Sequence, residues 1–217
     1  MKKNPKINFY NLFWIFLIGS VFGFIIELIW FVIKWGFFQY NQGTIYGPFQ
    51  PIYGFGAVMI AVLCSTLKTK KKWLLFLIGF VAFGLFEYIS GWFMEYCLGA
   101  FAWDYTRVGF NYTIGKWVYL PYCFIWGFFA VIWDMWINKP LLNFLNRFKS
   151  KKIKYLTIVL AVFMIFNLAL TSLATIRKIE RSKDIPPHNE LKRFIDTHYD
   201  DEYMKKWLPK IRVPKKI

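Results

Sequence analysis

Five carboxylates are the side chains best suited to chemistry in the first 176 residues of this chain. They are Glu27, Glu87, Glu95, Asp104 and Asp134, and none of them lies in the short basic segments where a charge would be well solvated. A carboxylate inside an apolar helix costs at least about 2.5 kcal/mol, so it needs a partner, water or a proton. Glu27 and Glu87 are therefore candidates for a substrate, ion or proton site, with structural pairing between helices as the alternative.

Both glutamates share a helix face with small residues. A four-residue spacing of glycine allows another helix to approach closely. At 100° per residue, the residues around Glu87 (Gly84, Glu87, Gly91 and Glu95) fall within an arc of about 80°. The last apolar stretch, at 153–176, carries a stripe of polar residues at helical spacing. These sets are Gly19, Gly23 and Glu27; Gly84, Glu87, Gly91 and Glu95; and Asn167, Thr171 and Thr175. We interpret all three faces as directed toward the interior of a bundle.

A run rich in proline and glycine, GPFQPIYGFG at 47–56, separates the first two apolar stretches. Proline cannot donate a backbone hydrogen bond and glycine relaxes the backbone, so this run cannot form one uninterrupted helix. The next span, 52–67, has 16 residues and reaches only about 24 Å of a hydrocarbon core of about 30 Å. We expect a re-entrant or broken segment at 44–56 that lines a site, because such backbone survives at depth only inside protein or beside water.

The composition is that of a polytopic membrane protein, with 57% hydrophobic and 23% aromatic residues among 217. The predicted fold is all-α, a transmembrane helical bundle with about five spans at 9–33, 52–67, 73–97, 118–138 and 153–176. We expect a transmembrane domain at 1–176 and a short, basic, amphipathic C-terminal tail at 177–217. The first span is too long for a secretory signal core, so it is expected to remain as a helix.

Lysine and arginine are distributed unevenly over the connections. Thirteen lie at the N-terminus and in 68–72 and 139–154, whereas three lie in 34–51 and 98–117. The positive-inside rule therefore predicts a cytoplasmic N-terminus. The net charge of +16 is explained by this bias and by anionic membrane lipids, so nucleic acid is not an expected partner.

The tail has two short helical patterns behind the break at Pro186 and Pro187. Five spans place it outside, despite its twelve Lys and Arg residues, whereas a re-entrant 47–67 segment would place it inside. Acids at 200–202 and lysines at 205 and 206 suit the dipole of the second helix. We expect these helices to lie on lipid headgroups, with docking of a partner as the alternative.

Several kinds of chemistry are not indicated. The sequence has no phosphate loop, its two histidines lie in the tail, and its three cysteines lack metal-ligand spacing. No metal and no other cofactor is therefore expected. Cys97 and Cys123 lie near the same predicted face, where a bridge is one option and free core side chains are the simpler one.

A set of short motifs adds a family resemblance. They are Glu27, NQG (41–43), GPFQPIYGFG (47–56), Glu87-Tyr88 with Glu95, WDY (103–105), Asn111, Gly115-Lys116 and Trp126-Gly127. With these motifs the chain resembles, over about residues 9–135, a family of small bacterial membrane proteins classified as ABC-transporter type IV permeases. The ending HYDDEYMKKWLPKI (198–211) resembles the family more loosely, and Gln42 stands where family members commonly have arginine.

The resemblance implies the permease subunit of a transporter in the bacterial cell membrane. Because the chain has no phosphate loop, use of ATP would need a separate ATPase subunit. The basic segment 139–154 is the candidate docking surface for that subunit, with a solvated positive-inside loop as the simpler alternative. Other expected partners are membrane lipids, a small solute or lipid-linked substrate, and a second copy of the chain. The glutamates would bind a cationic or amine-bearing solute or pass protons. The candidate substrate-binding residues are Glu27, Pro48, Pro51, Tyr53, Glu87, Glu95, Trp103, Asp104, Tyr105, Asn111 and Lys116.

Two alternatives stay open. A membrane-embedded enzyme could act on a lipid or lipid-linked substrate, with a glutamate as general base and Lys116 or Arg107 holding a phosphate. A non-catalytic assembly or regulatory protein could instead recruit partners through its tail.

Overall fold

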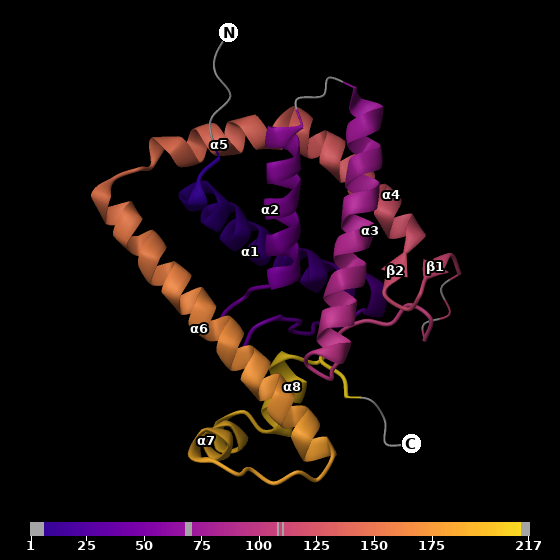
Figure 1. Ribbon diagram of the computed structural model, residues 1–217, viewed down its shortest axis with the longest axis vertical. Helices are drawn as coiled ribbons and strands as arrows, with labels where there is room; N and C mark the ends of the chain where they lie inside the picture. The colour runs from indigo at the N-terminus through magenta and orange to yellow at the C-terminus, as the bar shows by residue number, and fades with distance from the viewer. Residues whose placement is uncertain (1–6, 68–70, 108, 110, 214–217) are drawn as a thin grey trace.

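Five apolar helices run between two ends of the molecule in the computed structural model, which describes residues 7–67, 71–107, 109 and 111–213. They are α1 (Phe9–Trp35), α2 (Pro51–Thr66), α3 (Lys72–Tyr96), α4 (Leu120–Ile132) and α6 (Lys151–Ser182). In Figure 1 the start of α1 lies at the top, and α7 (Glu190–His198) and α8 (Asp201–Trp207) lie at the bottom. We call these the basic end and the tail end.

The predicted all-α bundle is confirmed. Four stretches are long and apolar enough to cross a membrane, and α2 is a shorter apolar helix of 16 residues. Large apolar side chains cover the outward faces of these helices, as Ile33 and Ile165 show with exposed fractions of 74% and 69%. An apolar exterior on long helices is the surface that a membrane requires, so the chain is a polytopic membrane protein.

The fourth span turns at the basic end. After α4 the chain passes through a π-helical segment, η1 (Trp133–Ile137), into α5 (Asn138–Arg147), which lies across the basic end in Figure 1. The interpretation of 139–154 as a connecting loop is therefore wrong for 139–147, which are helical. Leu142 and Leu145 fall on one helix face and are almost completely buried, so packing makes the segment helical.

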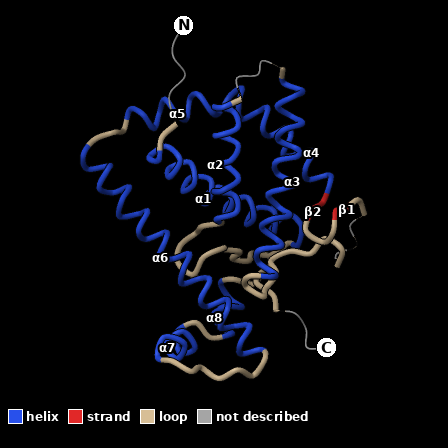
Figure 2. The backbone as a smooth tube through the Cα atoms, viewed as in Figure 1, coloured by secondary structure: helices blue, strands red, loops and turns tan. Residues whose placement is uncertain are grey.

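Irregular backbone covers a different range from the one expected. Residues 37–50 form the loop between α1 and α2, shown in tan in Figure 2, whereas 51–56 are already helical. Pro51 starts α2, where the lack of an N–H has no cost. Gly54 and Gly56 do not break the helix, because each one faces a close neighbour across a helix contact. The expected broken segment at 44–56 is therefore correct only for its first half.

The two glycine faces make the close helix contacts. A Cβ atom at Gly19 would lie 2.8 Å from the Cβ of Ala57, and one at Gly23 would lie 2.4 Å from the ring of Tyr53. In the second helix pair, a Cβ at Gly84 of the predicted α3 face would lie 3.2 Å from the Sγ of Cys123 in α4. A Cβ at Gly79, which is outside the predicted set, would lie 2.6 Å from that of Ala130 in α4. The helix pairs α1–α2 and α3–α4 therefore approach closely, as the small-residue spacing predicts.

The segment 98–119 folds over the tail end of α3. It contains a two-residue antiparallel pair, β1 (Thr113–Ile114) and β2 (Val118–Tyr119), with Thr113 opposite Tyr119. Gly115 turns the chain between them with a φ of +58°, in the region that favours glycine. Cys97 is exposed, Cys123 is buried, and both are free thiols, so the optional bridge between them is absent.

The tail packs against the bundle. Helix α6 continues past the expected domain boundary at 176 and ends at Ser182. The division into a transmembrane domain and a separate tail stays a prediction. In the part of the chain that follows α6, the side chains of Ile195, Met204 and Leu208 are almost completely buried. They belong to a cluster that also includes Ile45 and Ala100. This cluster is at odds with helices that simply lie on lipid headgroups.

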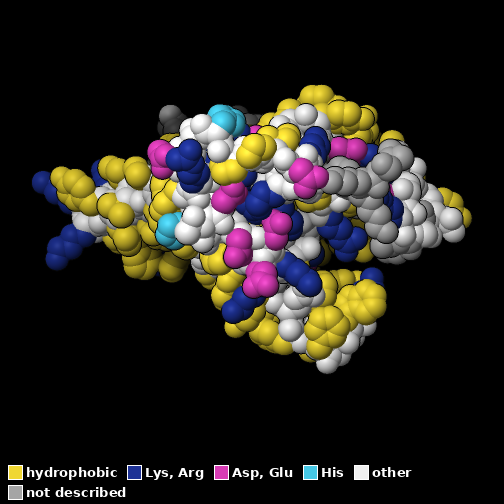
Figure 3. Space-filling view, turned by 90° about the horizontal axis from the view of Figure 1, so that it is seen from below, with side chains coloured by type: hydrophobic (Ala, Val, Ile, Leu, Met, Phe, Trp, Pro, Cys, Tyr) yellow, Lys and Arg dark blue, Asp and Glu magenta, His cyan; other side chains and the backbone are white. Residues whose placement is uncertain are grey.

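An ion-pair network holds the tail to the end of α6. Arg177, only 2% exposed, pairs with Asp196 at 2.5 Å and also with Glu180. Arg181 joins Asp196 and Asp201 at 2.6 and 2.7 Å. Hydrogen bonds from Arg177 outweigh partial burial and lower the pKa of Asp196. Figure 3, which views the tail end, shows acidic and basic side chains gathered at the centre of this face with hydrophobic ones around them.

We predict that Gly54→Ala separates α1 from α2. The new Cβ would lie 2.6 Å from the carbonyl oxygen of Phe16, a backbone atom that cannot rotate away. Denaturant unfolding of the protein in mixed micelles should show a loss of about 1–3 kcal/mol. The matched control is Gly84→Ala, whose Cβ would lie 3.2 Å from the Sγ of Cys123, a side-chain atom. An equal loss in both variants would contradict the close contact of α1 and α2.

Candidate functional site

Glu27 on α1 is bonded at both carboxylate oxygens. The hydroxyl of Tyr53, from α2, donates to Oε1 at 3.0 Å. The ammonium of Lys210, from the segment that follows α8, donates to Oε2 and forms an ion pair. The Glu27 side chain is 13% exposed, so this carboxylate is partly desolvated and its charge is balanced by a residue from the far end of the chain.

Among the described residues no Lys or Arg forms an ion pair with Glu87 on α3. The hydroxyl of Tyr105 donates to Oε1 at 3.4 Å, a long hydrogen bond. Oε2 is buried and has no close hydrogen-bond partner among the described residues. The side chain of Trp126 and the backbone of Tyr119 lie beside this carboxyl group. A buried oxygen with spare acceptor capacity is a place where a cation, a proton or a water molecule can bind.

Tyrosines connect the two glutamates. Tyr53 and Tyr122 each interact electrostatically with both Glu27 and Glu87. The Tyr122 ring lies 5.7 Å from that of Tyr105. We name this group the carboxylate–tyrosine cluster; its members are Glu27, Tyr53, Glu87, Tyr105, Tyr119, Tyr122 and Trp126.

Aromatic packing gives the cluster rigid walls. The Trp126 ring is stacked on Phe83 with centroids 4.7 Å apart, and it meets Tyr53 edge-on at 6.2 Å. Tyr119 and Tyr122 are in edge contact at 4.9 Å. Burial, and then the nearby Glu87 carboxylate, raises the pKa of Tyr105, so its hydroxyl stays protonated and available as a donor.

The segment 98–119 positions Tyr105. The backbone N–H of Tyr105 donates to the carbonyl of Lys116 at 2.9 Å, and the indole of Trp103 donates to the carbonyl of Trp117, also at 2.9 Å. Trp117 itself packs on Gly91, where a Cβ would lie 2.5 Å from its ring. The glycine in α3 and the turn after α3 therefore hold Tyr105 against Glu87.

Glu95, Asp104 and Asn111 lie apart from the cluster. Glu95 pairs with Lys116 at 2.5 Å and accepts a hydrogen bond from the Trp117 indole at 3.2 Å. Asp104 organises its own turn, since it accepts from the backbone N–H of Thr106 at 3.0 Å and pairs with Arg107 at 3.1 Å. Asn111 is exposed in the turn before β1.

The turn around Asp104 bears on the enzyme hypothesis. Burial opposes ionisation, but the hydrogen bonds of Thr106 prevail and lower the pKa of Asp104, so this acid remains a charged partner of Arg107. Lys116 and Arg107, which that hypothesis assigns to a phosphate, both pair with carboxylates of the protein. Among the described residues no group of three or more His, Cys, Asp or Glu side chains could hold a metal ion.

Polar side chains of α6 satisfy the irregular loop 37–50. Asn167, fully buried, accepts from the N–H of Tyr46 at 3.1 Å and donates to the carbonyl of Tyr46 at 2.7 Å. The hydroxyl of Thr171 accepts from the N–H of Ile45 at 3.0 Å. The predicted polar stripe on α6 thus provides the partners that non-helical backbone needs inside an apolar bundle.

The two candidate prolines have different positions. Pro51 starts α2 just before Tyr53, so it helps to place Tyr53 beside Glu27. Pro48 is exposed and lines a hollow of about 450 Å³ with Phe24, Tyr46 and Trp207. A second hollow of about 500 Å³ lies on α5 at the basic end. Neither of these two hollows is lined by Glu27 or Glu87.

Sequence reasoning missed three members of this arrangement. Tyr119 and Tyr122 lie at the start of the predicted fourth span, where tyrosine is common at a membrane interface, so nothing in the sequence marks them as part of a site. Lys210 lies in the tail that was assigned to lipid headgroups, and 183 residues separate it from its partner. The tail pattern in the resemblance covers Lys210, but nothing in its spacing relates it to Glu27. The fifth carboxylate, Asp134, lies at the basic end and pairs with Lys72 at 2.6 Å.

These features define a class: a polytopic helical membrane protein with two carboxylates and several tyrosines grouped inside its bundle. The particular family follows from its sequence. The chain belongs to the family described as "Putative ABC-transporter type IV", whose model matches residues 14–172. Among curated proteins and solved structures, no significant match is found. The family match confirms the resemblance drawn from the motifs.

We predict that Asn167→Leu releases the loop 37–50. Both backbone groups of Tyr46 would lose their partner in a buried place, which should cost at least about 2 kcal/mol and make the loop accessible to protease. The control is Asn143→Leu on the exposed face of α5, which should stay within about 0.5 kcal/mol of wild type. Denaturant unfolding and limited proteolysis measure both effects, and an intact loop in Asn167→Leu would contradict this role.

Proposed function

We propose that the protein is the permease subunit of an ABC-type transporter and that its carboxylate–tyrosine cluster binds a cationic or amine-bearing solute. The observation that supports this most directly is the charge balance of the cluster. Two carboxylates face it, and among the described residues only one ammonium, that of Lys210, is bonded to either of them. The remaining negative charge needs a cation or a proton.

The aromatic lining favours a cation over a proton alone. Tyrosine rings and the Trp126 indole present negative π faces, which attract an ammonium group by about 0.5–2 kcal/mol each. The buried Oε2 of Glu87, which has no close hydrogen-bond partner among the described residues, adds a charged acceptor. Carboxylates with aromatic walls are a chemically suitable environment for an organic amine, and the family membership supports a transport role.

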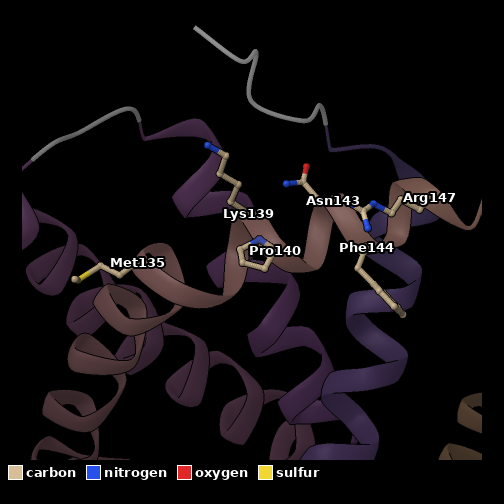
Figure 4. Close-up of a pocket in the computed structure, with 6 residues that line it drawn as sticks. All are labelled: Met135, Lys139, Pro140, Asn143, Phe144 and Arg147. Carbon is tan, nitrogen blue, oxygen red and sulfur yellow. The ribbon is translucent and has the colours of Figure 1, made fainter.

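The proposed ATPase docking surface is the exposed face of α5. Figure 4 shows Lys139 and Asn143 projecting from the same helix as Phe144 and Arg147 around the hollow at the basic end. From 135 to 179 the chain contains no acid, so no neighbour along the sequence neutralises these cations. The opposite face packs through Leu142 into the bundle core, so a force applied to α5 would reach α2 and α4. An acidic surface on the ATPase would complement this face.

We predict that Glu27→Gln and Glu87→Gln each lower transport by roughly 10- to 100-fold, the value of one charge-assisted hydrogen bond. The measurement is the initial rate of uptake or export of labelled primary, secondary and quaternary amines by cells that produce the protein. The control is Asp104→Asn, which changes an acid outside the cluster and should keep the wild-type rate. If both glutamine variants transport at the wild-type rate, the site is wrongly assigned.

We also predict that an ATPase co-purifies with the gently solubilised protein and is lost from the double variant Lys139→Glu/Arg147→Glu. Charge reversal on the exposed face should repel an acidic partner. The control is Lys151→Glu, an exposed lysine at the start of α6. Failure of any ATPase to co-purify with the wild type would count against the permease assignment. Retention by the double variant would place the docking surface elsewhere.

A further inference from the structure

We propose that Glu27 and Tyr53 form a binding site for a primary ammonium group and that the side chain of Lys210 is its built-in occupant. A ligand ammonium would have to displace Lys210 to reach Glu27. This inference deepens the proposed function by naming the ligand class, and it rests on that function only for the movement of the ligand across the membrane.

The first step is the chemistry of the ion pair between Glu27 and Lys210. An alkyl ammonium has three N–H donors and no acceptor, and Glu27 presents one carboxylate oxygen to it while Tyr53 holds the other. The Lys210 side chain ends in the group that a primary amine ligand would bring. The pair therefore shows which chemical group the Glu27 carboxylate accepts.

The second step is the anchoring of Lys210. On its two sides Leu208 is fully buried and Ile211 is 8% exposed. The following residue, Arg212, forms two backbone hydrogen bonds with Phe101, at 3.1 and 2.9 Å. The ammonium of Lys178 donates to the carbonyl of Ile211 at 2.8 Å. The backbone at 208–212 is thus held to the bundle on both sides of Lys210.

The third step is the freedom of the side chain. The Lys210 side chain is 35% exposed, whereas that of Glu27 is 13% exposed. The partly exposed ammonium can therefore move away from Glu27 while the Lys210 backbone stays anchored, and the less exposed carboxylate stays in place. A tethered ammonium competes at an effective concentration on the order of millimolar, so a free amine binds measurably only in excess or with further contacts.

The experiment is chemical rescue of the full-length protein in detergent. Lys210→Ala leaves the Glu27 carboxylate without its cation, so its melting temperature should fall. Millimolar n-butylammonium should restore the melting temperature of Lys210→Ala and bind it at least about tenfold more tightly than it binds wild type, by calorimetry. Tetramethylammonium, which has no N–H donor, should neither restore the melting temperature nor bind Lys210→Ala more tightly than wild type. Lys205→Ala, the control at an exposed lysine of α8, should show neither the fall nor the rescue.

Other outcomes overturn the proposal. Equal binding of n-butylammonium to wild type and Lys210→Ala would show that Lys210 does not occupy the site. Rescue that persists in Glu27→Gln/Lys210→Ala would show that the amine acts elsewhere. Should Lys210→Ala fail to fold, Lys210→Met retains most of the aliphatic stem, and the same comparison decides. The assay involves no transport, so a positive rescue with no amine transport would refute only the permease function.

Discussion

The structure depends on one constraint: every charge and every non-helical backbone group inside the apolar bundle must find its partner within the protein. Water is not available at a lipid-facing surface, and each unpaired polar group there costs several kcal/mol. The loop 37–50 meets this constraint through Asn167 and Thr171 of α6. Glu27 meets it through Tyr53 and Lys210. Glu87 meets this constraint only in part, because its buried Oε2 has no close hydrogen-bond partner among the described residues. This oxygen can therefore accept a ligand cation or a proton.

Close helix contacts make these partnerships geometrically feasible. Gly23 brings the Tyr53 ring against α1 and places its hydroxyl beside Glu27, one helical turn further along. Gly91 does the same for Trp117, whose segment carries Tyr105 to Glu87. Small residues thus have two effects here: they let helices approach, and they set the distance at which long polar side chains meet. The same glycines, Gly23 and Gly91, therefore determine both the helix packing and the geometry of the site.

The sequence predicted the elements better than the partnerships. Apolar periodicity located the first three helices within about two residues, because these signals are local. The fourth and fifth helical stretches continue beyond the predicted ends, to Arg147 and to Ser182. Glycine spacing identified the inward faces, and the polar stripe on α6 was recognised without its partner loop. The ion pair of Glu27 with Lys210 could not be predicted, since a separation of 183 residues leaves no local trace. Helix α5 was missed because its lysine, proline and asparagines resemble a basic loop until Leu142 and Leu145 are seen to be buried.

The order of synthesis separates the two members of the Glu27–Lys210 ion pair in time. Glu27 enters the membrane early, whereas Lys210 is synthesised 183 residues later, so the carboxylate passes through most of biogenesis without its cation. Nascent intermediates that end before the bridge between Phe101 and Arg212 therefore hold a protonated or hydrated acid in a half-built bundle. The ion pair can form only after the tail has been synthesised, so a chain truncated before Lys210 leaves the Glu27 carboxylate without this partner.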